Sequence, residues 1–193
     1  MREIELEMVK FLDEKLANNG LAQHAIKTKD GRLLFRLACE ACVGIREKGG
    51  NNKGPMVELI QKTIGGAVQE AWCMAAMQTC IAYAETKLRI KSKFFASEHC
   101  LTSWRNTPKE LRVIYFPLPG AIIIWQHGET ESGHTGCVVE ADAKTKTMFT
   151  VEGNTDSGIS EGRVERDGGG FYANHRSTIK NGSMRVVGFL KPF

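Results

Sequence analysis

The sequence predicts an α+β fold, because helical patterns fill its first half and strand patterns fill its second half. Up to about residue 90, apolar residues recur every three or four positions, which is the spacing of one helix face. After about residue 110, short runs rich in β-branched and aromatic residues are separated by Gly, Pro, Asn and Asp, as in an antiparallel sheet. The 193 residues, 42% hydrophobic and 25% charged, suffice for one core.

Four stretches of the first half have helical spacing. In the longest, apolar residues form one continuous stripe from Cys73 to Leu88. Cys73 therefore stands at the N-terminal end of a long helix. Loops rich in Gly and Asn, NNG at 18–20 and KGGNNKGP at 48–55, separate the helices. We expect helices at about residues 4–17, 31–47, 56–65 and 69–88.

The second half contains four predicted strands. A polar connection around residues 97–110 precedes them, and DGGG at 167–170 marks a turn. We expect the strands at 120–126, 134–141, 146–153 and 184–190.

The two middle strands bring three polar side chains together. A tight turn centred near Ala143 would set His134 opposite Glu152, and a pairing slipped by two residues would bring Asn154 opposite instead. In either register the three side chains share one face, since strands alternate with a period of two. A histidine and two polar residues on one face are unusual for a core.

Cys73 has the position of a nucleophile. A helix N-terminus stabilises a thiolate through its free N–H groups and the positive end of its dipole. The thiolate also needs a base, and His134, oriented by Glu152 or Asn154, supplies one if the helix packs its N-terminus on that face of the sheet. Alternatively, Cys73 is a packing residue, because free cysteines are among the most buried residue types and Cys73 shares its stripe with Cys80.

Four segments, GIREKGGNNKG, EAWCMAAM, GHTGCVVE and TVEGNT, occur in this order. Together they resemble the CHAP family of cysteine amidases and peptidases, relatives of the NlpC/P60 group, over about residues 38–190. The resemblance implies a papain-like fold, with N-terminal helices packed on an antiparallel β-sheet. It also implies a catalytic domain at 31–193, preceded by an N-terminal helical extension at 1–30.

The resemblance also implies roles for the polar residues. It places the nucleophile on Cys73, the general base on His134 and the orienting residue on Glu152, and Asn154 matches a polar position at the active site. The usual Trp-Cys-Ala-Ala is Trp-Cys-Met-Ala here, a mild departure.

Four further residues are candidates for substrate binding. Gln69 is a candidate to hold the oxyanion together with the backbone N–H of Cys73, the alternative being a solvent-facing glutamine. Asn51 and Asn52 lie in a segment that borders the cleft in the resembling family, although the segment is also a plausible turn. Trp72 either contacts substrate or packs against the sheet.

The resembling enzymes cleave amide bonds of peptidoglycan. We therefore expect a peptidoglycan hydrolase with a Cys-His-Glu thiol mechanism, either an endopeptidase of the stem peptide or an N-acetylmuramoyl-L-alanine amidase, as in a phage endolysin. Two alternatives remain open: a catalytically inert module that binds the cell wall, and a thiol acyltransferase on the same fold.

No cofactor or metal is expected. The Asp-rich calcium loop of some relatives has no clear counterpart in this sequence. A zinc site from Cys39, Cys42, His99 and Cys100 is a weaker alternative, because only one CxxC is present and it lies inside a helical stripe.

The net charge and the hydropathy of the chain limit the kinds of binding partner that the sequence predicts. The net charge of +4 and pI near 8.7 suit an anionic polymer, but the sequence lacks the clustered basic stripe of a nucleic-acid binder. No stretch reaches the ~18 apolar residues that span a bilayer, and the charged N-terminus lacks a signal-peptide core. We expect a monomer made in the cytoplasm, with its six cysteines reduced, that acts on the wall after lysis or delivery by a secretion system.

Overall fold

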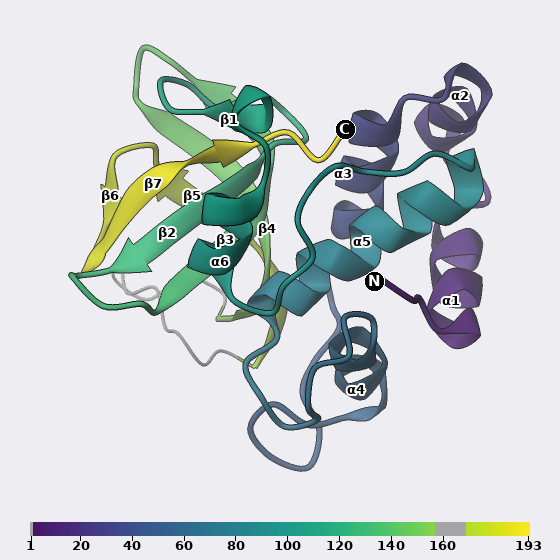
Figure 1. Ribbon diagram of the computed structural model, residues 1–193. Coiled ribbons are helices and arrows are strands. Elements are labelled where there is room, and N and C mark those ends of the chain that lie inside the picture. Colours follow the sequence, from purple (N-terminus) through teal and green to yellow (C-terminus); the bar gives the residue numbers. More distant parts are fainter. Residues whose placement is uncertain (1, 157–168) are drawn as a thin grey trace.

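The computed structural model describes residues 2–156 and 169–193. Helices α1 to α4 gather on one side and the strands on the other, with α6 beside the strands, and α5 extends from the helical side to the sheet (Figure 1). The predicted α+β class is confirmed. The helices are α1 Leu6–Leu16, α2 Gly20–Thr28, α3 Gly31–Ala41, α4 Pro55–Lys62, α5 Cys73–Leu88, α6 Cys100–Asn106 and the 3-10 helix η1 Lys109–Leu111. The strands are β1 Arg112–Val113, β2 Ile122–His127, β3 Gly133–Asp142, β4 Thr147–Thr155, β5 Gly170–Ser177, β6 Lys180–Asn181 and β7 Met184–Leu190.

The strands form one antiparallel sheet in the order β1-β7-β2-β3-β4-β5, with β6 paired to β7. The four predicted strands correspond to β2, β3, β4 and β7. Residues 167 and 168 of the predicted DGGG turn lie outside the described residues. None of the described helices is both long and apolar enough to span a bilayer.

Two helices and one long strand were not predicted from the sequence. Asn19 belongs to the NNG that was interpreted as a helix end, but its side chain accepts a hydrogen bond from the N–H of Ala22 and so caps the start of α2. α6 lies inside the predicted polar connection, and β5 begins at Gly170, the last residue of the DGGG segment. Short helices carry too few apolar repeats for a periodic pattern to reveal them.

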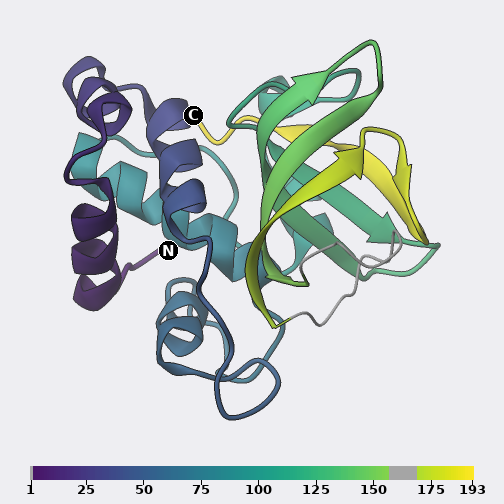
Figure 2. The same cartoon turned by 180° about the vertical axis from the view of Figure 1, so that it is seen from behind.

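The main core lies between the helices and one face of the sheet. Leu12 of α1, Phe35 of α3, Met77 of α5 and Ile124 of β2 are all fully buried in it. Ala22 and Ala25 of α2 belong to this core as well, so α1 and α2 pack on the same core as α5. The Arg2 side chain, only 5% exposed, forms an ion pair with Glu85 of α5 at 3.3 Å. The view from behind shows α3 beside the sheet and next to the C-terminus (Figure 2).

A glycine allows α5 to lie directly on the sheet. A Cβ atom at Gly153 of β4 would come within 2.6 Å of the Ala76 Cβ and 2.9 Å of the Trp72 ring. The small side chain of Ala76 on the helix side serves the same close approach. This contact places the N-terminus of α5 beside the C-terminal end of β4.

The register of β3 and β4 depends on a β-bulge. The predicted tight turn is present, but its centre lies between Lys144 and Thr145 rather than at Ala143: Asp142 pairs with Thr147, so the turn covers residues 143–146. An unbroken ladder from that turn would place His134 and Glu152 on opposite faces, because odd and even positions alternate. The register shifts between Val138 and Glu140, where Val139 is an extra residue in β3. This bulge returns both side chains to one face, as predicted.

Candidate active site

Cys73 is the first residue of α5, and the preceding residue anchors it. Trp72 is fully buried, and its indole Nε1 donates a hydrogen bond to Oε1 of Glu47 at 2.9 Å. No side chain caps the helix, so its first N–H groups remain available near the thiol. The N–H of Met74 contributes to lowering the pKa of Cys73. The sequence therefore positions a thiol at a rigid helix start.

Glu152 is the centre of a buried polar network. Its Oε2 accepts hydrogen bonds from Nε2 of His134 at 3.0 Å and from Nη2 of Arg176 at 2.8 Å. Its Oε1 accepts from Nε of Arg176 at 2.8 Å and from the hydroxyl of Thr150 at 2.5 Å. All four side chains are buried. The carboxylate is thus held rigidly, as required of a group that orients a catalytic base.

The bond to Glu152 also determines which imidazole nitrogen is available. Because Nε2 is engaged by the carboxylate, Nδ1 is the ring nitrogen left available to interact with the thiol. Trp125 stacks on the imidazole, with ring centroids 5.6 Å apart and an interplanar angle of 18°. His134 is therefore fixed by a carboxylate at its edge and by an indole on its face.

The site predicted from the sequence required α5 to pack its N-terminus on the sheet face that carries His134. In the structure α5 packs on the opposite face. Gly153 faces α5, so its neighbour Glu152 points to the opposite face of the sheet. His134 shares that face with Glu152 and Trp125. The thiol of Cys73 consequently meets the imidazole at the end of the sheet, where β3 begins.

The surroundings favour the charged forms of thiol and imidazole. The Cys100 thiol donates a hydrogen bond to Cys73, with the sulfur atoms 3.8 Å apart, and lowers the pKa of Cys73 well below its ordinary value of 9.0. Burial of Cys73 raises this pKa, and the interaction with His134 lowers it further. Burial alone would lower the pKa of His134, but its interactions with Cys73 and Glu152 raise that pKa to about 9. The site thus favours a thiolate-imidazolium pair.

Glu152 remains ionised in spite of its burial. Desolvation would raise its pKa, but the hydrogen bonds and charges of His134 and Arg176 lower that pKa to about 2. Positive and negative groups therefore alternate along Cys73, His134, Glu152 and Arg176. The opposite charges compensate one another, which a buried ionic network requires.

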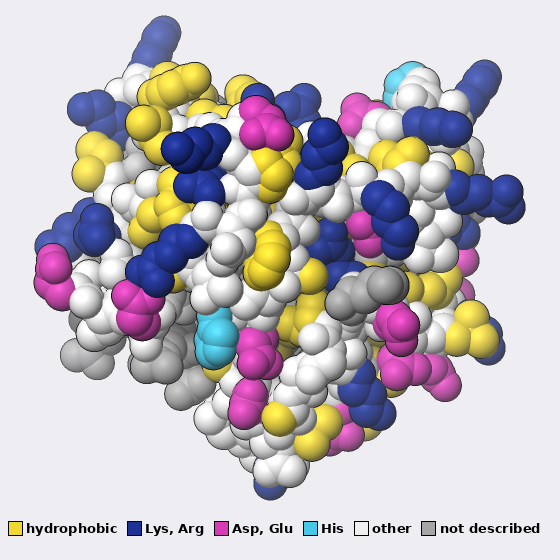
Figure 3. All heavy atoms as spheres, in the orientation of Figure 1, with side chains coloured by type: hydrophobic (Ala, Val, Ile, Leu, Met, Phe, Trp, Pro, Cys, Tyr) yellow, Lys and Arg dark blue, Asp and Glu magenta, His cyan; other side chains and the backbone are white. Residues whose placement is uncertain are grey.

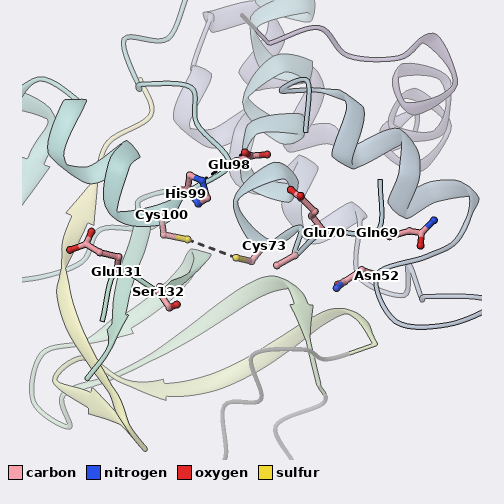
Figure 4. Close-up of a pocket in the computed structure, with 11 residues that line it drawn as sticks. Asn52, Gln69, Glu70, Cys73, Glu98, His99, Cys100, Glu131 and Ser132 are labelled. Atoms are coloured by element: carbon pink, nitrogen blue, oxygen red, sulfur yellow. Dashed lines mark hydrogen bonds and ion pairs between the residues drawn. The ribbon is translucent and has the colours of Figure 1, made fainter. Parts of the chain in front are cut away.

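The thiol opens onto a cleft of about 600 Å³. The side chains of Cys73 and Cys100 approach one another across it, with Asn52, Gln69 and Glu70 on one side and Glu131 and Ser132 on the other (Figure 4). Acidic side chains and a histidine also gather below the middle of the face seen in Figure 3. The cleft is lined by Asn52, Gln69, Glu70, Ala71, Cys73, Glu98, His99, Cys100, Glu131, Ser132 and Gly133.

The four candidate substrate-binding residues have different locations. Asn52 and Gln69 line the cleft, and the buried Oδ1 of Asn52 has no hydrogen-bond partner within the described part of the chain. Asn51 is exposed and does not line the cleft. Trp72 is fully buried against Phe171, with ring centroids 5.7 Å apart, and so offers no surface to a substrate.

Asn154 is buried at the end of β4 rather than in the cleft wall. Its backbone has a φ of 55°, a left-handed conformation that asparagine tolerates better than most residues. Neither amide atom has a hydrogen-bond partner among residues 2–156 and 169–193. The orienting partner of His134 is accordingly Glu152.

The residues of the alternative zinc site do not come together. Cys39 and Cys42 are buried in the main core, where the Cys42 sulfur lies 4.0 Å from that of Cys80. His99 and Cys100 instead line the cleft. Within the described residues, no group of three or more metal-binding side chains has the arrangement to hold a metal ion.

Two residues of the site were missed by sequence reasoning. Arg176 lies on β5, which pairs with β4, the strand of Glu152. A strand prediction for GFYANHRS, with this pairing, would have placed Arg176 on the same sheet face as Glu152. Cys100 was considered only as a zinc ligand. The proximity of its thiol to Cys73 depends on the path of the chain between α5 and α6, for which the sequence carries no signal.

Comparisons with known proteins add no relative: no family model matches the chain, and no curated protein or solved structure is significantly similar to it. The chemical capability of the site therefore rests on its geometry. A nucleophilic thiol, an oriented imidazole and free N–H groups at a helix start are the components of acyl transfer.

Proposed function

We propose that this protein is a cysteine hydrolase with a papain-like arrangement of the CHAP type, which cleaves amide bonds of peptidoglycan. The observation that carries the proposal is the meeting of a thiol at a helix N-terminus with a buried histidine whose Nε2 is held by a carboxylate. The order of the four sequence segments supports the choice of family.

The first half of the proposed reaction forms a thioester. The Cys73 thiolate attacks the amide carbonyl carbon, and the N–H groups at the start of α5 stabilise the oxyanion. The His134 imidazolium then gives its proton to the leaving nitrogen as the C–N bond breaks. Glu152 holds the imidazole in place through Nε2 during this transfer.

The second half regenerates the thiol. Neutral His134 removes a proton from a water molecule, whose oxygen attacks the thioester carbonyl. The C–S bond breaks, the acid product leaves, and the thiolate and imidazolium are restored. One histidine thus acts as acid and then as base, so both steps require its orientation to be kept.

The lining of the cleft supports a peptide substrate. Glu70 and Glu98 present carboxylates, and Asn52 and Gln69 present amide groups. Glu131 also lines the cleft, but its carboxylate is paired with Arg105. Such a surface offers hydrogen-bond partners to a peptide backbone and favours positively charged groups. The most exposed apolar side chains, such as Tyr115 and Ile114, lie outside this lining. No observation favours the acyltransferase alternative.

Digestion of purified peptidoglycan tests the proposal. Gram-negative and Gram-positive walls are incubated with wild type, with Cys73→Ala and with Cys42→Ala, and the fragments are analysed by mass spectrometry. Cys42 is a matched control, because it is an equally buried cysteine remote from the cleft. We expect wild type and Cys42→Ala to release fragments, and Cys73→Ala to be slower by roughly 10⁴-fold or more.

The fragments also identify the bond. New amino termini inside the stem peptide indicate an endopeptidase, and release of the whole stem peptide from the sugar indicates an amidase. Wall binding without any fragment, by wild type that is folded by circular dichroism, would instead support an inert binding module. Transfer of an acyl group to an added amine, with no hydrolysis, would support the acyltransferase.

A further inference from the structure

Cys73 is paired with a second thiol in the same cleft. Its Sγ atom lies 3.8 Å from the Sγ atom of Cys100, and both residues line the cleft although their exposed fractions are only 7% and 4% (Figure 4). The thiol mechanism described above uses Cys73 alone and leaves Cys100 without a chemical role. Two thiols at this separation, open to small molecules, form a potential redox site.

We propose that Cys73 and Cys100 form a reversible disulfide that blocks the active site when a peroxide reaches the cleft. The inhibitory consequence rests on the proposed function, because it requires Cys73 to be the nucleophile. Formation of the bond itself does not, since it depends only on the two neighbouring thiols.

The position of Cys100 at the start of a short helix favours the approach of its Sγ atom to that of Cys73. A disulfide needs a sulfur-sulfur distance of about 2.05 Å, so the sulfur atoms must approach by a little under ~2 Å. Cys73 begins the sixteen-residue helix α5 and is held by buried Trp72, whereas Cys100 begins the seven-residue helix α6 after a segment without regular structure. Rotation of the two side chains and a small shift of α6 supply the movement.

The chemistry balances with one peroxide. The Cys73 thiolate attacks a hydrogen peroxide oxygen, the O–O bond breaks, and the departing hydroxide takes the proton of the His134 imidazolium and leaves as water. This step produces a sulfenic acid on Cys73. The Cys100 sulfur then attacks the Cys73 sulfur, the S–O bond breaks, and the hydroxyl leaves with the Cys100 proton as a second water. Two thiols are oxidised and one peroxide is reduced.

A second cysteine pair provides an internal comparison. The sulfur atoms of Cys42 and Cys80 are 4.0 Å apart, nearly the same distance, but this pair lies in the main core and lines no cleft. Peroxide has access to one pair and is excluded from the other. Exposure rather than sulfur separation therefore predicts which disulfide forms.

Peptide mapping after mild oxidation tests the proposal. Reduced wild type, Cys100→Ser, Cys100→Ala and Cys42→Ala are treated with two equivalents of hydrogen peroxide, because a disulfide consumes one peroxide and a sulfinic acid two. They are then alkylated and digested without reduction. For wild type and Cys42→Ala we expect a mass loss of about 2 Da and a peptide linking Cys73 to Cys100, both reversed by dithiothreitol. In the Cys100 variants we expect no linked peptide and further oxidation of Cys73 to sulfinic acid, a gain of about 32 Da that dithiothreitol does not reverse.

Peptidoglycan digestion by the same samples gives the functional readout. Wild type should lose activity as the linked peptide accumulates and regain it with dithiothreitol. The activity that an oxidised Cys100 variant has lost should not return with dithiothreitol. The proposal is overturned if wild type accumulates sulfinic acid on Cys73 while Cys100 stays a free thiol, or if Cys42 and Cys80 link as readily. Because the mass readout needs no substrate, failure of the proposed function would appear separately, as reduced wild type that digests nothing.

Discussion

Arg176 binds both carboxylate oxygens of Glu152, with Nε 2.8 Å from Oε1 and Nη2 2.8 Å from Oε2. Such a bidentate pair is stronger and more directional than a single charged hydrogen bond. The positive charge of Arg176 balances the negative charge of the Glu152 carboxylate, which in turn binds His134. The orienting unit of this site is therefore the Glu152–Arg176 pair rather than Glu152 alone.

Replacing Arg176 by Met should destabilise the protein strongly. The variant would leave the Glu152 carboxylate buried with only His134 as a charged partner, and breaking a buried pair in this way costs about 3–5 kcal/mol. Thermal unfolding at neutral pH measures the effect as a lower Tm. Activity should fall as well, because the carboxylate that orients His134 is no longer fixed.

The exposed pair of Arg105 and Glu131 is a matched control. It is also bidentate, through Nη1 and Nη2 of Arg105 at 2.6 and 2.8 Å from the Glu131 oxygens, but both side chains are largely in solvent. Arg105→Met should leave the Tm nearly unchanged, since water screens exposed ion pairs. Equal losses of Tm in the two variants would contradict the role assigned to burial.

Cys73 should react with iodoacetamide well below pH 9. Only the thiolate is alkylated, and the Cys100 thiol and His134 lower the pKa of Cys73 well below 9.0. The alkylation rate, followed by mass spectrometry from pH 4 to 10, should already be substantial at neutral pH. His134→Ala should shift the reaction to higher pH, whereas a wild-type rate that first rises near pH 9 would refute the ion pair.

Stability should decline on both sides of neutral pH because of two groups of the network. The pKa of Glu152 is lowered from 4.5 to about 2, so its contribution is complete above about pH 4.5 and is lost as the pH falls toward 2. The pKa of His134 is raised from 6.5 to about 9, so its contribution is complete below about pH 6.5 and is lost as the pH rises through 9. The lowered pKa of Cys73 acts in the opposite direction up to pH 9.0, so the two effects largely cancel between pH 6.5 and 9 and the net alkaline decline falls near pH 9 and above.

The pH dependence of Tm checks these limits. In His134→Gln the decline near pH 9 and above should be shallower than in wild type, while the decline between pH 4.5 and 2 should persist in part through Arg176. Parallel Tm curves for the two proteins across the alkaline range would show that His134 does not titrate as proposed.

Gly136→Ala should reduce activity through Glu152. A Cβ atom at Gly136 would lie 2.6 Å from Cγ of Glu152 and 3.0 Å from the carbonyl oxygen of Val151. The carboxylate would have to move away from His134, and a displacement of about 1 Å in such a group costs on the order of 10²-fold in rate. The measurement is kcat/KM on peptidoglycan fragments, alongside Tm.

Gly20→Ala is the control for that substitution, because no atom lies within 4 Å of the added Cβ. It should keep wild-type activity. If Gly136→Ala retained full activity, then either Glu152 would not need its observed position or the neighbouring strand would adjust without cost.

Much of the fold follows from local patterns. The apolar stripe that begins at Cys73 predicted α5, because it reflects burial of one helix face. Short runs rich in β-branched and aromatic residues, separated by turn residues, predicted β2, β3, β4 and β7. Helices α2 and α6 escaped prediction, since each is short and one begins at an Asn-Gly that also resembles a helix end. Their positions depend on capping and on contacts with the rest of the chain.

The sequence by itself determined which residue types stand at the ends of the elements that form the site: a cysteine at a helix start, a histidine at a strand start and a glutamate near the end of the next strand. Only the tertiary structure decided that His134 and Glu152 share a face, because the extra residue Val139 changes the parity of the ladder. It likewise decided that Arg176 and Cys100 join them. Contacts between distant segments depend on packing and chain path, whereas periodicity records only which face of each element is buried.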